Sequence, residues 1–267
     1  DYMQSLADGS GKPQVVPAFK SFLQQPGVPL VNIDWSCTRT EDKTARIDVQ
    51  LLQKRYLPLG SSGSTDRLWQ IPVCLVSVAD GERTRECALI TRKSQTITLK
   101  AQVCPAAVMP NADGAGYFRW TMSKAKWQAL LGQMDKLSAS EALSMEDSLW
   151  AAVLSGEAQA ETYFKAAAML AQRDAWDVAS SPMGGLSYIM EKWLKEDAQT
   201  PARIYFSEMY KPLFARLGLS GDGELDQQDP ISAALLRRPV VWFLAFAARD
   251  SEVRQSLTEL GKAYIGF

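Results

Sequence analysis

The hydrophobic period of this chain changes once, near residue 122, and that change restricts the fold more than any other feature of the sequence. From about residue 30 to residue 122, short runs alternate apolar and polar residues and are separated by Gly, Ser and Asp. Such alternation indicates strands that bury one face. From Ser123 onward, apolar residues recur at the spacing of one helix face, beginning with Trp127, Leu130, Leu131, Met134 and Leu137. We therefore predict a multidomain chain in which a β part is followed by an α part.

The β part is predicted to be a small antiparallel β-sandwich, because several short strands follow one another with frequent turns. The segments typical of strands are 30–35, 45–51 with 53–56, 68–73, 88–90, 96–100 and 116–120. Asp80 and Gly81 give a strong type I′ turn signal, which predicts a hairpin over 72–88. Residues 60–64 contain only Gly and Ser and are expected to form a flexible loop.

The α part is predicted to be a solenoid-like stack of helical hairpins, because short amphipathic segments are joined by short polar loops. Those segments cover about 157–173, 183–196, 201–217, 230–248 and 251–264. Ser138 is followed three residues later by Glu141, a capping-box pattern that marks the start of another helix. Pro212 and Pro239 are each expected to kink or break the helix that contains them.

The charge and hydropathy of the chain argue against two classes of partner. The sequence has 29 Lys and Arg against 30 Asp and Glu, a net charge of −1. This balance offers no electrostatic attraction for nucleic acid or for an anionic membrane. The longest strongly apolar run is 240–248, which is far shorter than the about 20 residues of a membrane-spanning helix. We therefore predict a buried helix segment there and no membrane span.

The sequence contains no histidine. This excludes Ser-His-Asp and Cys-His catalysis and nearly all catalytic zinc sites, and it removes the commonest general base. The stretch around Ser220 approaches the pattern G-x-S-x-G, but it follows no predicted strand and has no histidine to activate the hydroxyl group. The alternating carboxylates from Asp222 resemble a calcium loop, but the required Gly and the final Glu are missing. No residue is therefore predicted to be catalytic or to bind a metal or cofactor.

Two of the four cysteines face each other in the predicted hairpin. Counting outward from the turn sets Cys74 opposite Cys87 at a non-hydrogen-bonded position, where Cα atoms lie about 4.5 Å apart. We predict a disulfide between them, with two facing free thiols as the alternative. Cys37 and Cys104 would then pair by elimination, without a geometric argument. Disulfides indicate an extracytoplasmic compartment such as a bacterial periplasm, whereas free thiols would fit the cytoplasm.

Four short motifs follow one another between residues 22 and 119. They are Phe22-x-x-Gln25-x-Gly27-x-Pro29, Gln53-x-Arg55-Tyr56, Trp69-x-Ile71-Pro72, and Asn111 followed by Gly116-Tyr117-Phe118-Arg119. In order and spacing they resemble zinc metallo-aminopeptidases of the aminopeptidase N type. In that family W-x-x-Q-x-G-x-P ends the catalytic domain, and Q-x-R-F, W-x-I-P and N…GYYR lie in the β-sandwich that follows. The chain departs from the first motif by having Phe22 in place of Trp.

The resemblance extends more loosely into the α part. Trp127 and Asp147 stand where the family begins its helical C-terminal domain, although the Arg that usually precedes this Asp is missing. The zinc-binding HExxH motif and the substrate-binding G-x-M-E-N motif of the family precede the junction and have no counterpart in this sequence. No catalytic residue of the family therefore transfers to any position here.

The resemblance implies three regions and a function. Residues 1–28 would be the end of a missing catalytic domain, 29–122 the sandwich, and 123–267 a helical domain whose end need not be residue 267. The sandwich would link the catalytic domain to the helical domain, which would cap the active site and limit access to peptides. The catalytic domain would be an intramolecular partner and would hold the zinc ion, while this fragment would need no cofactor and would be inactive alone.

Two rival interpretations use the same sequence differently. The chain could be an independent module in which sandwich and helices bind a peptide or protein, so that residues 1–28 form a self-sufficient element. Alternatively it could be an enzyme that uses two carboxylates converging in a pocket. Under the leading interpretation, Phe19, Phe22 and Leu23 form an apolar stripe that faced the catalytic domain, and the first 28 residues pack loosely.

Overall fold

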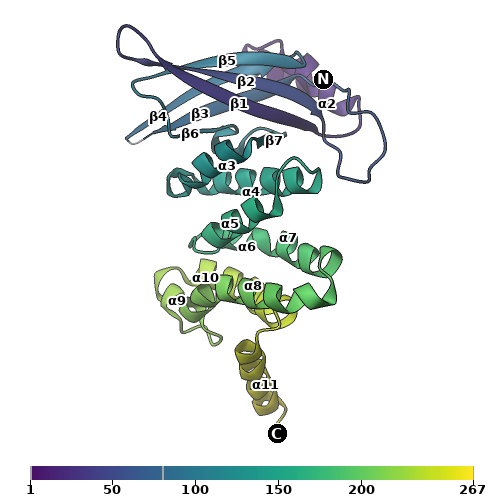
Figure 1. Cartoon of the computed structure of the whole chain (residues 1–267), viewed down its shortest axis with the longest axis vertical. Coiled ribbons are helices and arrows are strands. Elements are labelled where there is room, and N and C mark those ends of the chain that lie inside the picture. The colour runs from purple at the N-terminus through teal and green to yellow at the C-terminus, as the bar shows by residue number, and fades with distance from the viewer. Residues whose placement is uncertain (1, 80, 267) are drawn as a thin grey trace. The chain divides into compact units, whose positions relative to one another are not determined.

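The structure is a computed structural model that describes residues 2–79 and 81–266 (Figure 1). The described strands lie within 29–122, and the helices from α3 onward follow them. The predicted order of a β part and then an α part is therefore confirmed. Two helices, α1 (Tyr2–Ser10) and α2 (Val15–Leu23), precede the first strand. The chain divides into two compact units, Asp1–Tyr163 and Phe164–Phe267.

Two sheets make up the β part. The larger has the strand order β5-β2-β1-β7 and the smaller the order β4-β3-β6. The strands are β1 (Pro29–Arg39), β2 (Ala45–Arg55), β3 (Ile71–Ala79), β4 (Glu82–Ile90), β5 (Ser94–Ala101), β6 (Ala107–Met109) and β7 (Arg119–Met122). In β2, alternate residues from Ala45 to Gln53 are buried, so the period-2 pattern of the sequence does mark one buried face.

Strands β3 and β4 form the predicted hairpin. Ala79 pairs with Glu82, and Cys74 pairs with Cys87, which is the register that counting from the turn gives. Strand β3 is buried along most of its length because β4 and β6 pair with its two edges. The register is therefore fixed both by the turn and by the buried face.

Three features of the β part differ from the prediction. Strand β6 has no counterpart among the predicted strands, because three residues are too few to show an alternation. Strand β7 begins at Arg119, after the predicted start at residue 116, because the side chain of Asn111 binds the backbone of Gly116 in place of a neighbouring strand. Strand β7 also runs parallel to β1, so the larger sheet is mixed.

The first helices after the sandwich are α3 (Lys124–Leu131) and α4 (Ala139–Leu154). The predicted capping box is confirmed: the amide of Glu141 donates to Ser138 Oγ at 3.2 Å, and the amide of Ser138 donates to Glu141 Oε2 at 3.0 Å. The apolar stripe over 127–137 does not belong to one helix. Helix α3 ends before Gly132, and the rest of the stripe lies in the short turn η2 (Met134–Lys136) and the residue after it.

The remaining helices continue through α5 (Ala160–Leu170), which crosses the boundary between the compact units. They are α6 (Trp176–Ser180), α7 (Pro182–Tyr188), the π-helical turn η3 (Ile189–Trp193), α8 (Glu196–Leu217), α9 (Glu224–Gln228), α10 (Pro230–Trp242), the π-helical turn η4 (Phe243–Ala247) and α11 (Ser251–Ile265). Helices α6 and α9 are too short for a period of 3.6 to reveal them.

The two prolines that were expected to kink or break a helix lie in different settings. Helix α8 continues through Pro212 to Leu217, so it is not broken there. Pro212 lacks the amide that would bond the preceding turn, but the bonds of the flanking turns are retained by the rest of the helix. Pro239 lies near the end of α10, and the π-helical turn η4 begins four residues later, where the regular hydrogen-bond pattern changes.

One segment of the described residues, Pro230–Ala247, is long and apolar enough to be a candidate membrane span, with a mean hydropathy of 1.3. A third of this segment is buried inside the protein, and core helices of soluble proteins pass the same test. Phe243 and Leu244 are fully buried within it, whereas Trp242 and Phe246 are exposed. The predicted apolar run is therefore a helix that buries one side.

Candidate functional site

Helix α2 is fastened to the sandwich by two polar side chains. Gln25 Nε2 donates to the carbonyl oxygen of Leu68 at 2.7 Å, and the amide of Gln70 donates to Ser21 Oγ at 3.0 Å. These bonds use the backbone groups of 68–70 before β3 begins. The Gln of the first motif is therefore a structural residue that holds the junction helix against the sandwich.

Gly27 allows the chain to turn from α2 into β1. Its φ of +109° lies in the region that side chains with a Cβ rarely adopt. A Cβ at this position would lie 2.7 Å from Nε of Arg55. Gly27 of the first motif therefore lies against Arg55 of the second motif, where the junction comes close to β2.

The second and third motifs meet through one buried amide. Gln53 is only 1% exposed. Its Nε2 donates to the carbonyl oxygens of Trp69 at 2.9 Å and Arg92 at 3.0 Å, and its Oε1 accepts from the amide of Trp69 at 2.9 Å. The side chain thus satisfies three backbone groups that no strand pairing covers.

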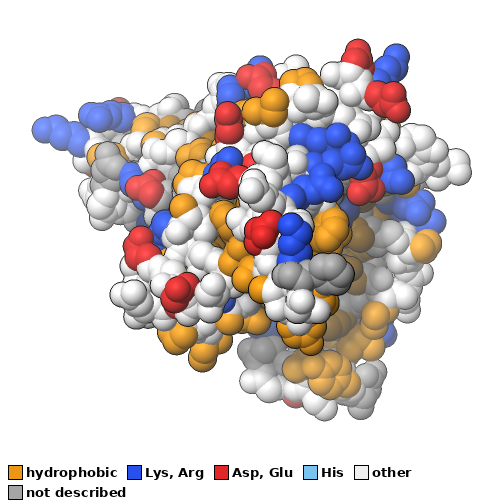
Figure 2. All heavy atoms as spheres, turned by 90° about the horizontal axis from the view of Figure 1, so that it is seen from below, with side chains coloured by type: hydrophobic (Ala, Val, Ile, Leu, Met, Phe, Trp, Pro, Cys, Tyr) orange, Lys and Arg blue, Asp and Glu red, His pale blue; other side chains and the backbone are white. Residues whose placement is uncertain are grey.

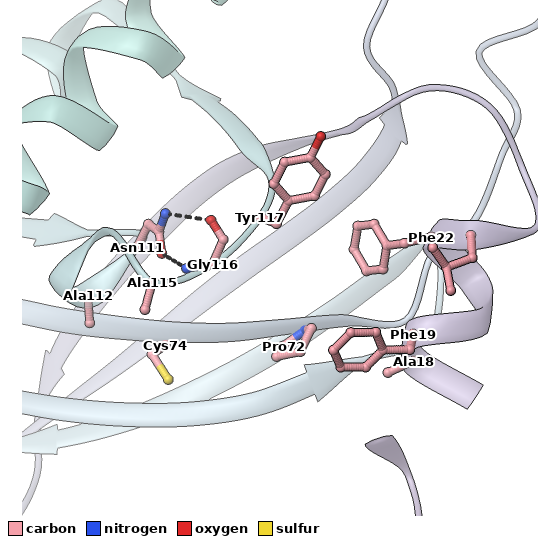
Figure 3. Close-up of a pocket in the computed structure, with 11 residues that line it drawn as sticks. Ala18, Phe19, Phe22, Pro72, Cys74, Asn111, Ala112, Ala115, Gly116 and Tyr117 are labelled. Carbon is pink, nitrogen blue, oxygen red and sulfur yellow. Dashed lines mark hydrogen bonds between the residues drawn. The ribbon is translucent and has the colours of Figure 1, made fainter. Parts of the chain in front are cut away.

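The fourth motif forms a folded loop around Asn111 (Figure 3). Asn111 Oδ1 accepts from the amide of Gly116 at 2.7 Å, and Nδ2 donates to the carbonyl oxygen of Gly116 and to Ser144 Oγ, both at 3.0 Å. A Cβ on Gly116 would lie 2.4 Å from the ring of Phe118. The loop is therefore closed by a side chain and requires Gly at its end.

Arg119, the last residue of the fourth motif, joins three segments of the first unit. Its guanidinium lies 4.5 Å from the ring centroid of Tyr56, and Nη2 lies 3.4 Å from Oδ1 of Asp147 on α4. The following residue, Trp120, is fully buried and stacks on Trp127 of α3 with ring centroids 4.6 Å apart. The motifs that carry the resemblance therefore hold the sandwich and the first helices together.

An apolar cavity of about 490 Å³ lies between α2, β3 and the Asn111 loop (Figure 3). Its lining residues are Ala18, Phe19, Phe22, Leu23, Pro72, Cys74, Asn111, Ala112, Ala115, Gly116 and Tyr117. Phe22 and Tyr117 meet edge to face across it, with centroids 6.0 Å apart. Leu23 is 71% exposed and Tyr117 is 73% exposed, so this part of the first unit presents apolar surface to its surroundings.

A second cavity, of about 520 Å³, shares Asn111, Gly116 and Tyr117 with the first. It also reaches Arg119 and Asp147, so it has an ion pair in its wall where the first cavity is apolar. Tyr117 lines both cavities. The ring of Tyr117 is the exposed one among the three residues that the two cavities share.

Glu146 on α4 is the described carboxyl group with the largest pKa change. Its pKa is raised to about 7, chiefly by burial and to a smaller extent by the nearby charge of Asp147. The hydroxyl group of Tyr163 donates to Glu146 Oε1 at 2.7 Å and opposes the rise. No sequence motif marks the pair of Glu146 and Tyr163. The position of Glu146 between Met145 and Leu149, which are both buried, could have indicated a buried carboxyl group.

A different carboxylate, Glu141, is fully buried and ion-paired. Arg83 Nη2 on β4 lies 2.6 Å from Glu141 Oε1, and the other oxygen accepts from the cap of α4. This carboxylate therefore ties the smaller sheet to the start of α4. Glu146 accepts a hydrogen bond from Tyr163, whereas Glu141 binds Arg83 and the cap of α4. In the described part of the chain, no contact between Glu146 and Glu141 joins them as a catalytic pair.

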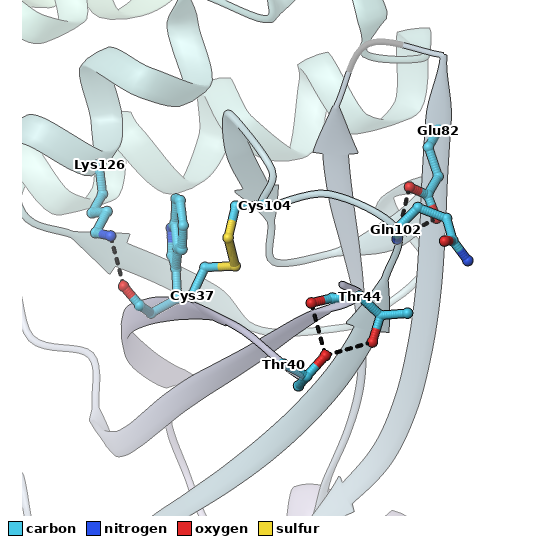
Figure 4. Close-up of a disulfide and its surroundings, with 8 residues drawn as sticks. Cys37, Thr40, Thr44, Glu82, Gln102, Cys104 and Lys126 are labelled. Atoms are coloured by element: carbon cyan, nitrogen blue, oxygen red, sulfur yellow. Dashed lines mark hydrogen bonds between the residues drawn. A yellow bond between two sulfur atoms is a disulfide. The ribbon is translucent and has the colours of Figure 1, made fainter. Parts of the chain in front are cut away.

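The four cysteines lie in two pairs. The structure joins Cys74 to Cys87 across the β3–β4 hairpin, and Cys37 to Cys104 between β1 and the loop after β5 (Figure 4). Near the second pair, Lys126 Nζ of α3 donates to the carbonyl oxygen of Trp35 at 2.6 Å. Cys37 and Cys104 are 67 residues apart in sequence, a pairing for which the sequence offered no geometry. Formation of both bonds in the purified protein stays a prediction.

The polar loop after α8 is a structural turn. Asp226 accepts from the amide of Gly223 at 3.0 Å and is paired with Arg237 of α10. Arg237 also donates to the carbonyl oxygens of Leu217 and Gly218 at the end of α8, both at 3.2 Å. Asp226, one of the carboxylates that resembled a calcium loop, is thus ion-paired with Arg237. Among the residues that the structure describes, no group of three or more Cys, Asp or Glu could hold a metal ion.

A comparison with protein families matches residues 107–266 to the ERAP1-like C-terminal domain. The match begins at β6, includes the Asn111 loop and β7, and continues through the helices to the end of α11. This is the assignment expected for the C-terminal part of an aminopeptidase N-type enzyme, and it covers more than half of the chain. The chain belongs to the ERAP1-like C-terminal domain family.

Proposed function

We propose that this chain is the non-catalytic C-terminal region of a zinc metallo-aminopeptidase that removes N-terminal residues from peptides. Residues 1–28 would end the catalytic domain, 29–122 would form the linking sandwich, and 123–267 would form a cap that limits access to the active site. The catalytic domain would supply the zinc ion and the catalytic residues. This chain would position the catalytic domain and enclose its active site.

The fastening of α2 is the observation that carries this proposal. Gln25 and Ser21 hold the helix against 68–70, while Phe19 is 43% and Leu23 is 71% exposed beside an apolar cavity. A self-sufficient module gains nothing from exposing these side chains, because each could bury against the sandwich. A junction helix that contacts a second domain accounts for both the polar anchor and the apolar surface.

The contact can be tested in the protein expressed together with its upstream coding sequence. Phe19→Glu combined with Leu23→Glu is expected to lower the melting temperature of the catalytic domain and its activity on an aminoacyl-anilide. Leu52→Glu is a matched control, because Leu52 is an exposed apolar residue of β2 outside the cavity. Equal behaviour of the double variant and the control would contradict a domain contact at α2.

The cap can be tested by its effect on substrate size. Removal of 164–267 from the same longer protein is expected to leave cleavage of an aminoacyl-anilide within a few-fold of the intact enzyme. Cleavage of long peptides and of a small folded protein with a free N-terminus should increase, because a cap acts by exclusion. Unchanged size selectivity would contradict the cap while leaving the sandwich assignment intact.

Two further parts of the proposal concern the chain alone and its compartment. The isolated chain is expected to hold no stoichiometric zinc and to cleave no aminoacyl-anilide, since it lacks histidine. The two cysteine pairs support an oxidising, extracytoplasmic location such as a periplasm. Elemental analysis, an anilide assay and peptide mapping of a non-reduced digest test these statements directly.

An independent binding module is the second candidate function. It is favoured by the apolar cavity of about 490 Å³, which is large enough for one or two hydrophobic side chains of a peptide. The two candidates differ in the behaviour of residues 2–28. Amide protection there equal to that of β1 and β2 would favour the module, whereas low protection would favour a helix that awaits a second domain.

A further inference from the structure

A polar pocket of about 270 Å³ lies within the second compact unit, where η3, α8 and the end of η4 meet. Its lining residues are Ser187, Met190, Glu191, Gln199, Arg203, Phe246, Ala247 and Arg249. Arg203 and Arg249 also line a neighbouring cavity of about 430 Å³. On the molecular face shown in Figure 2, Lys and Arg side chains gather in one area next to hydrophobic side chains. Arg203 and Arg249 therefore line the same two hollows of the second unit.

Arg203 is held in place but is incompletely hydrogen bonded. Its Nη2 donates to Gln199 Oε1 at 2.8 Å, one helical turn away on α8. Gln199 is itself fixed, because its Nε2 donates to the carbonyl oxygen of Leu194 at 3.3 Å. The Nε–H of Arg203 is buried and has no hydrogen-bond partner among the described residues. A buried donor of a charged group without a partner is costly, and the guanidinium group of Arg203 is hydrogen bonded at Nη2 but not at Nε.

Arg249 adopts a backbone conformation that disfavours its own side chain. Its φ is +54°, in the left-handed region where Gly is the usual residue at the end of a helix. The following amide, that of Asp250, donates to the carbonyl oxygen of Leu244 at 2.8 Å, so the helix end itself needs only the backbone. A Gly would satisfy this position with less strain, and the arginine side chain must have another reason to be there.

The neighbouring carboxylates are engaged elsewhere or too distant to pair. Asp250 accepts from Ser207 at 2.6 Å, caps α11 and lies 3.2 Å from Lys211. Glu191 lines the pocket, but no ion pair joins it to Arg203 or Arg249 among the described residues. The pocket thus presents two arginines against one carboxylate, with Ser187 and Gln199 as neutral polar neighbours.

We propose that this pocket binds a small oxyanion, a phosphate or carboxylate group, between the guanidinium groups of Arg203 and Arg249. The planar fork of a guanidinium matches two oxygen atoms of such a group. The guanidinium group of Arg203 would gain a second acceptor besides Gln199, and the side chain of Arg249 would gain a role that offsets its strained backbone. This site is independent of the proposed aminopeptidase role, since none of its residues belongs to the junction motifs.

The test is a titration of the purified chain by calorimetry, with inorganic phosphate and with succinate in separate arms at constant ionic strength. Binding should be saturable in at least one arm, and the tighter arm identifies the chemical class of the oxyanion. Arg203→Gln is expected to weaken binding at least about tenfold, because a charge-assisted pair is lost. Glu191→Gln is expected to tighten binding, because a repulsive carboxylate is removed.

Arg249→Gly separates binding from folding. It should weaken binding about as much as Arg203→Gln while leaving the melting temperature unchanged or higher, because Gly suits a positive φ. Arg254→Gln is the matched control, since it removes an exposed arginine of α11 outside the pocket. The proposal is overturned if neither anion binds saturably, if both pocket variants bind like the original protein, or if the control weakens binding equally.

Discussion

The contacts within the β-sandwich differ in kind from the contacts within the helices of 164–267. In the sandwich, side chains bind backbone groups far away in sequence: Gln53 binds Trp69, and Gln25 binds Leu68, 43 residues distant. In the second unit distant segments are joined by charged side chains, as in the contacts of Arg237 with the end of α8 and of Asp250 with Ser207, and by rings such as Tyr210 and Phe243. All four cysteines lie in the sandwich.

The difference shows which substitutions each unit tolerates. A buried amide that satisfies several backbone groups cannot be replaced without leaving those groups unpaired. An apolar contact between helices can be repacked by another side chain of similar volume. The family match covers 107–266, so it includes only β6, the Asn111 loop and β7 of the sandwich together with the helices that follow.

The largest expected effect is that of removing the buried amide of Gln53. Gln53→Leu would leave the amide and carbonyl groups of Trp69 and the carbonyl group of Arg92 without partners. At about 1–3 kcal/mol for each of these three buried groups, the free energy of unfolding should fall by at least about 3 kcal/mol. Denaturant unfolding measures it. Gln50→Leu, at an exposed position of the same strand, should change it by less than about 0.5 kcal/mol.

Hydrogen exchange can show in which unit Gln53→Leu lowers the stability. Hydrogen exchange of Gln53→Leu should show reduced protection in β1, β2 and β5, with protection of α8 and α10 retained. Equal loss of protection in 164–267 would contradict the division of the chain into two separate compact units.

The two cysteine pairs should differ in their effect on stability. In the chain-entropy model, a bridge between residues 67 apart stabilises by about 4 kcal/mol and one between residues 13 apart by about 3 kcal/mol. Replacing Cys37 and Cys104 by Ser should therefore lower the free energy of unfolding more than replacing Cys74 and Cys87. Free alkylation of all four cysteines without a reductant would remove both effects and the argument for an oxidising compartment.

A third prediction concerns pH and Glu146. Because its folded pKa of about 7 lies above the ordinary value, the folded state binds more protons than the unfolded state between about pH 4.5 and 7. The stabilising contribution of the protonated carboxyl group is complete below this window and is lost as the pH rises through it, by about 1–3 kcal/mol. Glu146→Gln should abolish this part of the pH dependence. A stability profile in that variant with an unchanged slope would show that another group is responsible.

Much of the sandwich was predictable because strands leave a local pattern. The alternation of β2 and the pairing of Cys74 with Cys87 follow from neighbours in sequence. Asp80, which gave the turn signal, lies outside the described residues. Strand β6 and the parallel pairing of β7 were not predictable, since both depend on where a distant strand lies. The capping box at Ser138 was predictable for the same local reason.

The sites were less predictable than the fold. The cavity at Tyr117 is built from α2, β3 and the Asn111 loop, which sequence spacing does not bring together. The meeting of Arg203 with Arg249 likewise depends on how α8 packs on η4. The shifted pKa of Glu146 depends on burial, and a helical pattern only showed that a Glu stood among apolar residues.

The smallest expected effects separate two kinds of glycine. Gly27→Ala should lower the free energy of unfolding by about 1–3 kcal/mol, because the backbone has a positive φ and the new Cβ would meet Arg55. Gly184→Ala within α7 meets no atom within 4 Å and has helical geometry, so it should raise stability by about 0.5–1 kcal/mol through helix propensity. Denaturant unfolding of both variants measures the difference. A stabilising Gly27→Ala would contradict the close approach of the junction to Arg55 of β2 and leave only the hydrogen bonds of Ser21 and Gln25 to hold the junction helix.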